Sequence, residues 1–210
     1  PMMLDRREQI AALAERHASE YHGLDFSAAM IAAARRRNRG FACERNFIVG
    51  SGEVLPYAGQ SFDVVIAIGF IEYFRDPHLP LAEIRRVLRP GGLALIQSFK
   101  EESLGKLYGW LRHPLRTFFG ERRAADLVPR PEEWVDLKYD QHELDGLLAA
   151  HGFRRKAHAF NHFYLLPGPV RRRFPSAHIG LSEAVGRAAP DLLRGMAVNY
   201  FGKYVLQEPA

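Results

Sequence analysis

The sequence has a single cysteine, Cys43, in 210 residues. An intrachain disulfide and a cluster of cysteine metal ligands are therefore excluded, and we expect a reducing, cytoplasmic setting with no metal site. No apolar run approaches the roughly 18 residues that a membrane-spanning helix needs. No signal-peptide pattern opens the chain. Glycine is absent before Gly23, and this bears on the cofactor site discussed below.

A chain of this length with 47% hydrophobic residues can bury one substantial core, so we expect a single domain over 1–210. The net charge of +5 comes largely from arginine clusters. A basic balance permits attraction to nucleic acid, anionic lipid or acidic substrates. However, Arg35–Arg37 close a predicted helix, where cations complement the helix dipole. We therefore interpret most of these arginines as solvated helix faces.

Strand and helix patterns alternate through the first half of the chain. A nearly continuous apolar run, FDVVIAIGF, is typical of a parallel strand that is covered on both faces. This alternation predicts a doubly wound, mostly parallel, Rossmann-like α/β sheet. The expected strands are 20–26, 47–49, 62–70 and 93–99, and the expected helices are 6–18, one that begins after Ser27, and one over 81–88.

The second half of the chain is less regular. Residues 140–143 resemble a capping box, and Gly152 ends the helix that follows. Residues 153–164 and 197–207 read as two longer strands, which we expect to pair antiparallel at the sheet edge. The remaining segments, 101–139 and 165–196, are too long for plain connections. We therefore predict that they are helical insertions that cover the site and define the substrate.

Asp25 is the most informative single residue. A short strand delivers its carboxylate to a loop, and a helix starts immediately afterwards with Ser27 as N-cap. At the tip of the second strand of a doubly wound fold, such a carboxylate can bind both hydroxyls of a ribose. The alternative is a loop aspartate that merely precedes a helix cap. The residues alone leave both interpretations open.

Three segments together resemble the class I S-adenosylmethionine-dependent methyltransferases, in particular the small-molecule subgroup. They are GLDFSAAMIAAAR at 23–35, GSGEVLPYAGQSFDVVIAIGFIEYFRDP at 50–77 and EIRRVLRPGGLALIQSF at 83–99. Their order and spacing match the family. The resemblance covers about residues 6–100 well and the terminal helix and strands loosely, and it implies S-adenosylmethionine as the cofactor.

The resemblance also implies which residues contact this cofactor. Asp25 matches the acidic residue that binds the ribose, and Phe26 and Met30 match positions that flank the adenine, although such residues are more often core than cofactor contacts. Family members often have aspartate where this chain has Ser51. The expected cofactor-binding residues are Asp25, Phe26, Met30, Ser51, Gly52, Glu53, Ile68, Gly69 and Phe70.

The chain departs from the family at its start. The family places a glycine-rich loop after its first strand, so that backbone N–H groups approach the cofactor closely. We expect that residues 3–5 end this first strand and that the printed sequence lacks the loop after them, since the chain opens on Pro1 rather than methionine. The alternative is that the protein has no such loop and binds the cofactor weakly.

Methyl transfer from a sulfonium needs mainly alignment and exclusion of water, and it needs a base only if the acceptor must lose a proton. The candidate catalytic residues are His162 and Tyr73. The alternative is that His162 has no catalytic role, since a histidine on an edge strand is usually a surface residue or a hydrogen-bonded core residue. The candidate substrate residues are Tyr108, Trp110, His158 and Tyr164.

The segment 107–119 carries an apolar stripe at helical spacing with two arginines beside it. We favour a lid helix, and the alternative is a surface for peripheral contact with an anionic membrane. The expected function is methyl transfer to a small molecule. Two alternatives remain: a catalytically inactive binding protein with the methyltransferase fold, and a nucleic-acid methyltransferase. Because no dedicated nucleic-acid module is recognisable, we expect no nucleic-acid partner.

Overall fold

The computed structural model describes residues 20–37, 44–99, 137–163, 165, 173–188 and 197–207. The chain divides into two compact units, Pro1–Tyr57 and Ala58–Ala210. The predicted helix over 6–18 and most of the predicted insertion over 101–139 lie outside the described residues. Among the helices that are described, none is long and apolar enough to span a membrane.

Over residues 20–37 and 44–57, the first unit shows a parallel pair of strands and a helix. Strand β1 (Glu20–Asp25) pairs with β2 (Glu44–Val49), and helix α2 (Ala28–Arg37) connects them. A Cβ atom on Gly23 would lie 2.6 Å from the Phe47 ring, so this close strand contact requires glycine. The strand–helix–strand order agrees with the prediction.

Helix α2 begins where the sequence predicted. The hydroxyl of Ser27 accepts a hydrogen bond of 3.4 Å from the backbone N–H of Met30, and its carbonyl accepts one of 3.1 Å from Ile31. Ser27 is therefore the N-cap. Near the other end, Arg35 donates to the carbonyl of Phe47 at 2.6 Å, which ties the helix to β2.

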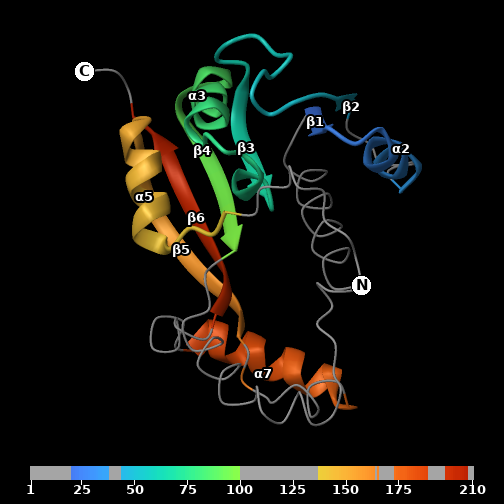
Figure 1. The fold of residues 1–210 in the computed structure, drawn as a ribbon, viewed down its shortest axis with the longest axis vertical. Helices are drawn as coiled ribbons and strands as arrows, with labels where there is room; N and C mark the ends of the chain where they lie inside the picture. The colour runs from blue at the N-terminus through green and yellow to red at the C-terminus, as the bar shows by residue number, and fades with distance from the viewer. Residues whose placement is uncertain are drawn as a thin grey trace. The chain divides into compact units, whose positions relative to one another are not determined.

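The second unit contains a four-stranded sheet of order β3-β4-β6-β5 (Figure 1). Strands β3 (Phe62–Ile68) and β4 (Leu88–Phe99) are parallel, and β6 (Ala197–Leu206) runs antiparallel to both β4 and β5 (Phe153–Phe163). The α/β class is confirmed. The expectation of a mostly parallel sheet holds only in part, because two of the three pairings in this sheet are antiparallel. The predicted antiparallel pair, β5 and β6, lies at one edge of this sheet, as expected.

One face of this sheet carries the core. Helices α3 (His78–Val87) and α5 (Gln141–Ala150) both pack on it, as Figure 1 shows. The buried residues on these helices and on the strands beneath them include Leu81, Ile84, Leu144, Leu148, Ala94, Ile96, Tyr200 and Tyr204. The two faces of β3 differ, since Val64 and Ile66 are 45% and 40% exposed. The prediction that β3 is covered on both faces was therefore wrong for these two side chains.

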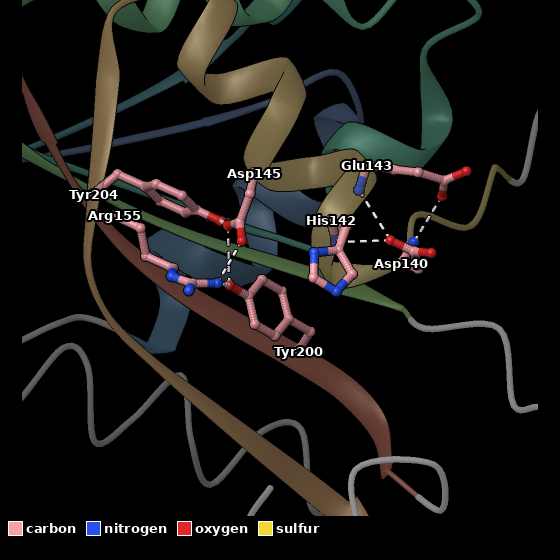
Figure 2. Close-up of polar contacts among 7 residues, drawn as sticks. All are labelled: Asp140, His142, Glu143, Asp145, Arg155, Tyr200 and Tyr204. Carbon is pink, nitrogen blue, oxygen red and sulfur yellow. Dashed lines mark hydrogen bonds and ion pairs between the residues drawn. The ribbon is translucent and has the colours of Figure 1, made fainter.

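Helix α5 starts at the predicted capping box. The carboxylate of Asp140 accepts from the N–H groups of His142 and Glu143, and the Glu143 carboxylate accepts from the N–H of Asp140 at 2.9 Å (Figure 2). Gly152 follows the helix with a φ of 79°, a conformation that favours glycine. Both ends agree with the sequence pattern.

Two further elements belong to the second unit. The turn η1 (Ile71–Tyr73) follows β3 after Gly69, whose φ of 56° requires a residue that tolerates the left-handed region. Helix α7 (Pro175–Ala188) lies beside β5, where the N–H of Phe163 donates to the hydroxyl of Ser182 at 2.8 Å (Figure 1). The described part of the insertion 165–196 is therefore helical, as expected.

Candidate functional site

Asp25 lies at the carboxyl end of β1, as predicted. Its Oδ1 accepts a hydrogen bond of 2.8 Å from the N–H of Ser27. Among the described residues, Oδ2 of the same carboxylate has no hydrogen-bond partner. Asp25 therefore supports the start of α2 and also presents an oxygen that can accept from a ligand hydroxyl. The two interpretations of this residue are compatible.

Two large apolar side chains beside Asp25 are exposed. Phe26 is 82% exposed and Met30 is 43% exposed. An aromatic side chain of this size is usually buried, because exposing it to water forgoes the free energy of burial. The core interpretation of Phe26 and Met30 was therefore wrong. Their exposure beside a carboxylate is the arrangement that a nucleoside needs, with an apolar platform for the base.

The loop after β2 lies against the same strand end. The N–H of Gly50 donates to the carbonyl of Asp25 at 3.1 Å, which joins the ends of β1 and β2. The loop then turns through Ser51, whose hydroxyl accepts from the N–H of Glu53 at 3.2 Å, while Gly52 is buried. Within the first unit, the structure thus brings the predicted ribose and adenine residues to one strand edge.

These residues fit the nucleoside part of S-adenosylmethionine. Asp25 offers a carboxylate oxygen for the ribose, and Phe26 and Met30 offer apolar contact for the adenine. A hydroxyl at Ser51 is a weaker partner for an adenine amino group than the aspartate that is frequent in the family. An acceptor oxygen beside exposed apolar side chains therefore suits an uncharged ribose and an aromatic base.

The second unit contains the other predicted cofactor residues, at the carboxyl end of β3. Ile68 is the last residue of β3 and is paired with Gln97, and Gly69 and Phe70 follow. The Phe70 ring contacts the Phe74 ring edge-on, with centroids 4.8 Å apart. Tyr73 is partly exposed, and its N–H donates to the carbonyl of Phe70 at 3.2 Å. The cofactor role of the first three residues and the catalytic role of Tyr73 stay predictions.

Polar side chains are buried at this end of the sheet. Glu72 and Ser98 are fully buried, and Gln97 is nearly so. The amide of Gln97 donates to the side chain of Asn199 at 3.3 Å, which bridges β4 and β6. Burial of polar groups is costly unless they are hydrogen-bonded. A concentration of such groups at a strand end indicates a functional region rather than ordinary core.

Sequence reasoning missed Tyr139. The N–H of Leu137 donates to the carbonyl of Glu72 at 2.9 Å, so the segment before α5 lies against η1. Tyr139 packs against the core, and its hydroxyl is buried. No local pattern marks this residue. The contact joins segments that are far apart in the sequence.

His158 lies midway along β5 and is half-buried. Its ring contacts those of Phe160 and Tyr200, with centroids 5.5 and 6.1 Å away. This placement favours packing on the α5 side of the sheet, and a substrate role stays a prediction. The backbone of His162 belongs to β5, but its side chain is outside the described residues. Tyr108, Trp110 and Tyr164 also lie outside them.

Comparison with known proteins supports the resemblance. Residues 7–96 match the family described as "Methyltransferase domain". The resemblance to the class I S-adenosylmethionine-dependent methyltransferases is confirmed. Solved structures share this fold: an S-adenosylmethionine-dependent methyltransferase from Methanosarcina mazei has a TM-score of 0.62 at 17% identity, and the match covers 94% of this chain and 87% of that one. A methyltransferase structure from Bacillus halodurans has a TM-score of 0.60 at 13% identity, covering 96% and 89%.

Curated relatives are similar over shorter stretches. The demethylmenaquinone methyltransferase of Renibacterium salmoninarum is 33% identical over 98 residues, 47% of this chain and 36% of that protein. A ubiquinone/menaquinone biosynthesis C-methyltransferase of Pectobacterium atrosepticum is 27% identical over 153 residues, 70% of this chain and 59% of that protein. The chain therefore spans less than two thirds of either relative. The family match supports the predicted cofactor, S-adenosylmethionine, and its binding by this chain belongs to the proposal below.

Proposed function

We propose that this protein transfers a methyl group from S-adenosylmethionine to a small-molecule acceptor. The observation that carries the proposal is the carboxylate of Asp25 beside the exposed Phe26, at the joined ends of two parallel strands. In this fold class, ligands bind at the carboxyl ends of the strands, and an acidic residue there accepts from the ribose. The family match supports the same cofactor.

In the first unit, Asp25 would accept from the ribose hydroxyls, and Phe26 and Met30 would pack on the adenine. Ser51, Gly52 and Glu53 would border its edge. In the second unit, Ile68, Gly69 and Phe70 would line the methionine end. The bound cofactor supplies an activated methyl group, so the protein needs to orient the acceptor and exclude water. His162 and Tyr73 are the candidates for holding an acceptor proton.

For the acceptor, we propose a hydroquinone ring whose carbon receives the methyl group. The relatives support this class: besides the two above, a rice chloroplast protein named 2-methyl-6-phytyl-1,4-hydroquinone methyltransferase is 36% identical over 94 residues. We further propose one domain over 1–210 with substrate-defining insertions at 101–139 and 165–196, a lid over 107–119, and a cytoplasmic location. The candidate substrate residues Tyr108, Trp110, His158 and Tyr164 belong to this proposal.

The proposal is tested by calorimetric titration of the full-length protein with S-adenosylhomocysteine. Asp25→Asn should weaken binding about 10- to 100-fold, because hydrogen bonds to a charged group contribute about 1.5–3 kcal/mol. Asp63→Asn is the matched control, since Asp63 is an exposed carboxylate that pairs with Arg89 at 2.5 Å. Equal affinity of Asp25→Asn and the unmodified protein would contradict the site.

A second measurement separates enzyme from binding protein. Incubation with S-adenosylmethionine labelled on the methyl group and 1,4-naphthohydroquinone, kept reduced under nitrogen, should yield a labelled naphthohydroquinone. S-adenosylhomocysteine binding without methyl transfer to this or related hydroquinones would favour the inactive binding protein. Transfer to RNA or DNA instead would favour the nucleic-acid methyltransferase.

A further inference from the structure

The hydroxyl of Tyr139 is buried and makes no hydrogen bond within the described part of the chain. A buried hydroxyl without a partner destabilises the folded state relative to one that is hydrogen-bonded. Native proteins rarely retain such a group in a core, and phenylalanine would fill the same space without this cost.

The backbone on both sides of Tyr139 is held in place. On one side, the N–H of Leu137 donates to the carbonyl of Glu72 at 2.9 Å, immediately after β3. On the other side, the capping box of Asp140 and Glu143 fixes the first turn of α5. The position of the tyrosine ring is therefore determined by contacts that do not involve its hydroxyl. Such a group is preorganised to bind a ligand.

The surroundings keep this hydroxyl protonated. Burial raises the pKa of Tyr139, and the carboxylates of Glu143, Glu72 and Asp76 raise it further, because each disfavours a neighbouring phenolate. At neutral pH, Tyr139 is therefore a hydrogen-bond donor and does not act as a base. Its natural partner is an oxygen or nitrogen with a lone pair, and the buried Glu72 shows that polar groups gather here.

We propose that Tyr139 binds the methyl acceptor by donating a hydrogen bond to a ring oxygen of a hydroquinone. The inference rests on the proposed function, because it places the acceptor at the carboxyl end of β3. It assigns a role to a residue that the family motifs do not include. It also explains why a tyrosine stands where a phenylalanine would pack at least as well.

The variant Tyr139→Phe tests this assignment, because loss of the hydroxyl affects binding and stability differently. Dissociation constants are measured for 1,4-naphthohydroquinone and for naphthalene, both with S-adenosylhomocysteine present, together with the thermal unfolding midpoint. We expect affinity for naphthohydroquinone to fall roughly two- to tenfold, the range for a neutral hydrogen bond. Affinity for naphthalene, which has no oxygen, should stay unchanged, and the unfolding midpoint should be equal or higher.

Tyr204→Phe is the matched control, since Tyr204 is a buried tyrosine whose hydroxyl has a protein partner, Asp145, at 2.8 Å. It should lower the unfolding midpoint and leave naphthohydroquinone affinity unchanged. Equal naphthohydroquinone affinity of Tyr139→Phe and the unmodified protein, or a loss of stability like that of Tyr204→Phe, would overturn the inference. So would the absence of naphthohydroquinone binding by an unmodified protein that binds S-adenosylhomocysteine. Absence of S-adenosylhomocysteine binding would instead contradict the proposed function itself.

Discussion

Tyr204 of β6 donates a hydrogen bond of 2.8 Å to Oδ1 of Asp145 in α5, and this bond anchors the helix to the sheet (Figure 2). Tyr200 donates to the same oxygen at 3.1 Å, and Arg155 of β5 pairs with Oδ2. Both tyrosines are fully buried, and burial raises the pKa of each hydroxyl. They therefore remain donors over the physiological pH range, and one carboxylate joins α5 to two strands.

Removal of this carboxylate should destabilise the protein clearly. Asp145→Ala removes the shared acceptor of two buried tyrosine hydroxyls and one guanidinium, so we expect a loss of about 2–3 kcal/mol in the free energy of unfolding. Urea unfolding followed by circular dichroism measures this change. Asp63→Asn, which breaks an exposed pair with Arg89, should cost well under about 1 kcal/mol. Similar losses in the two variants would argue against the anchoring role.

The absence of a side chain at Gly202 leaves room for the Tyr204 ring, whose hydroxyl bonds to Asp145. A Cβ atom at this position would lie 2.2 Å from Cε2 of the Tyr204 ring, so Gly202→Ala must displace the ring and its hydroxyl. Overpacking of this kind costs about 1–3 kcal/mol. Gly146→Ala, in α5, is a control of opposite sign, because nothing lies within 4 Å of its Cβ position and alanine favours helix. We expect thermal unfolding to show a lower midpoint for Gly202→Ala and an equal or higher one for Gly146→Ala.

The elements with local signals were predicted well from the sequence. The sequence at 140–143 predicted the capping box, and Gly152 predicted the end of α5. Ser27, as a typical N-cap residue, predicted the start of α2. In each case the hydrogen bonds join residues that are two to four positions apart, so one short stretch of sequence contains both partners.

Features that depend on distant pairing could not be predicted in the same way. The register of β6 against β4, with Leu93 opposite Val205, joins segments more than 100 residues apart, and no local pattern specifies it. Tyr139 was missed for the same reason, since its placement follows from the Leu137–Glu72 contact. The apolar run of β3 suggested burial on both faces, but periodicity alone does not reveal which neighbours cover each face.

Phe26 should contribute to ligand binding without contributing to stability. Because it is 82% exposed, Phe26→Ser removes little buried surface, and the free energy of unfolding should change by less than about 0.5 kcal/mol. If the ring packs on adenine, affinity for S-adenosylhomocysteine should fall about fivefold or more, since aromatic stacking contributes roughly 1 kcal/mol or more. Val54→Ser is the matched control, because Val54 is 73% exposed in the same unit. Equal affinity of the two variants would show that the adenine does not contact Phe26.

A hydrogen bond between His78 and His151 joins α3 to the end of α5. Nδ1 of His78 lies 3.0 Å from Nε2 of His151, so one nitrogen must donate and the other must accept. Two protonated rings cannot make this bond. Burial lowers the pKa of His151, as do the nearby His78 and Arg85, while Asp76 opposes the shift. The folded protein therefore binds fewer protons at His151 than the unfolded chain does.

The sign of the pH effect follows from this difference. The stabilisation is fully present above the unfolded pKa of about 6.5 and is lost as the pH falls below it, because protons then favour the unfolded chain. We expect the thermal unfolding midpoint to decrease between pH 7.5 and 5, and His151→Gln should reduce that decrease. His142→Gln, which removes an exposed histidine from α5, should leave the slope unchanged. A slope unaltered by His151→Gln would show that this histidine pair does not link stability to pH.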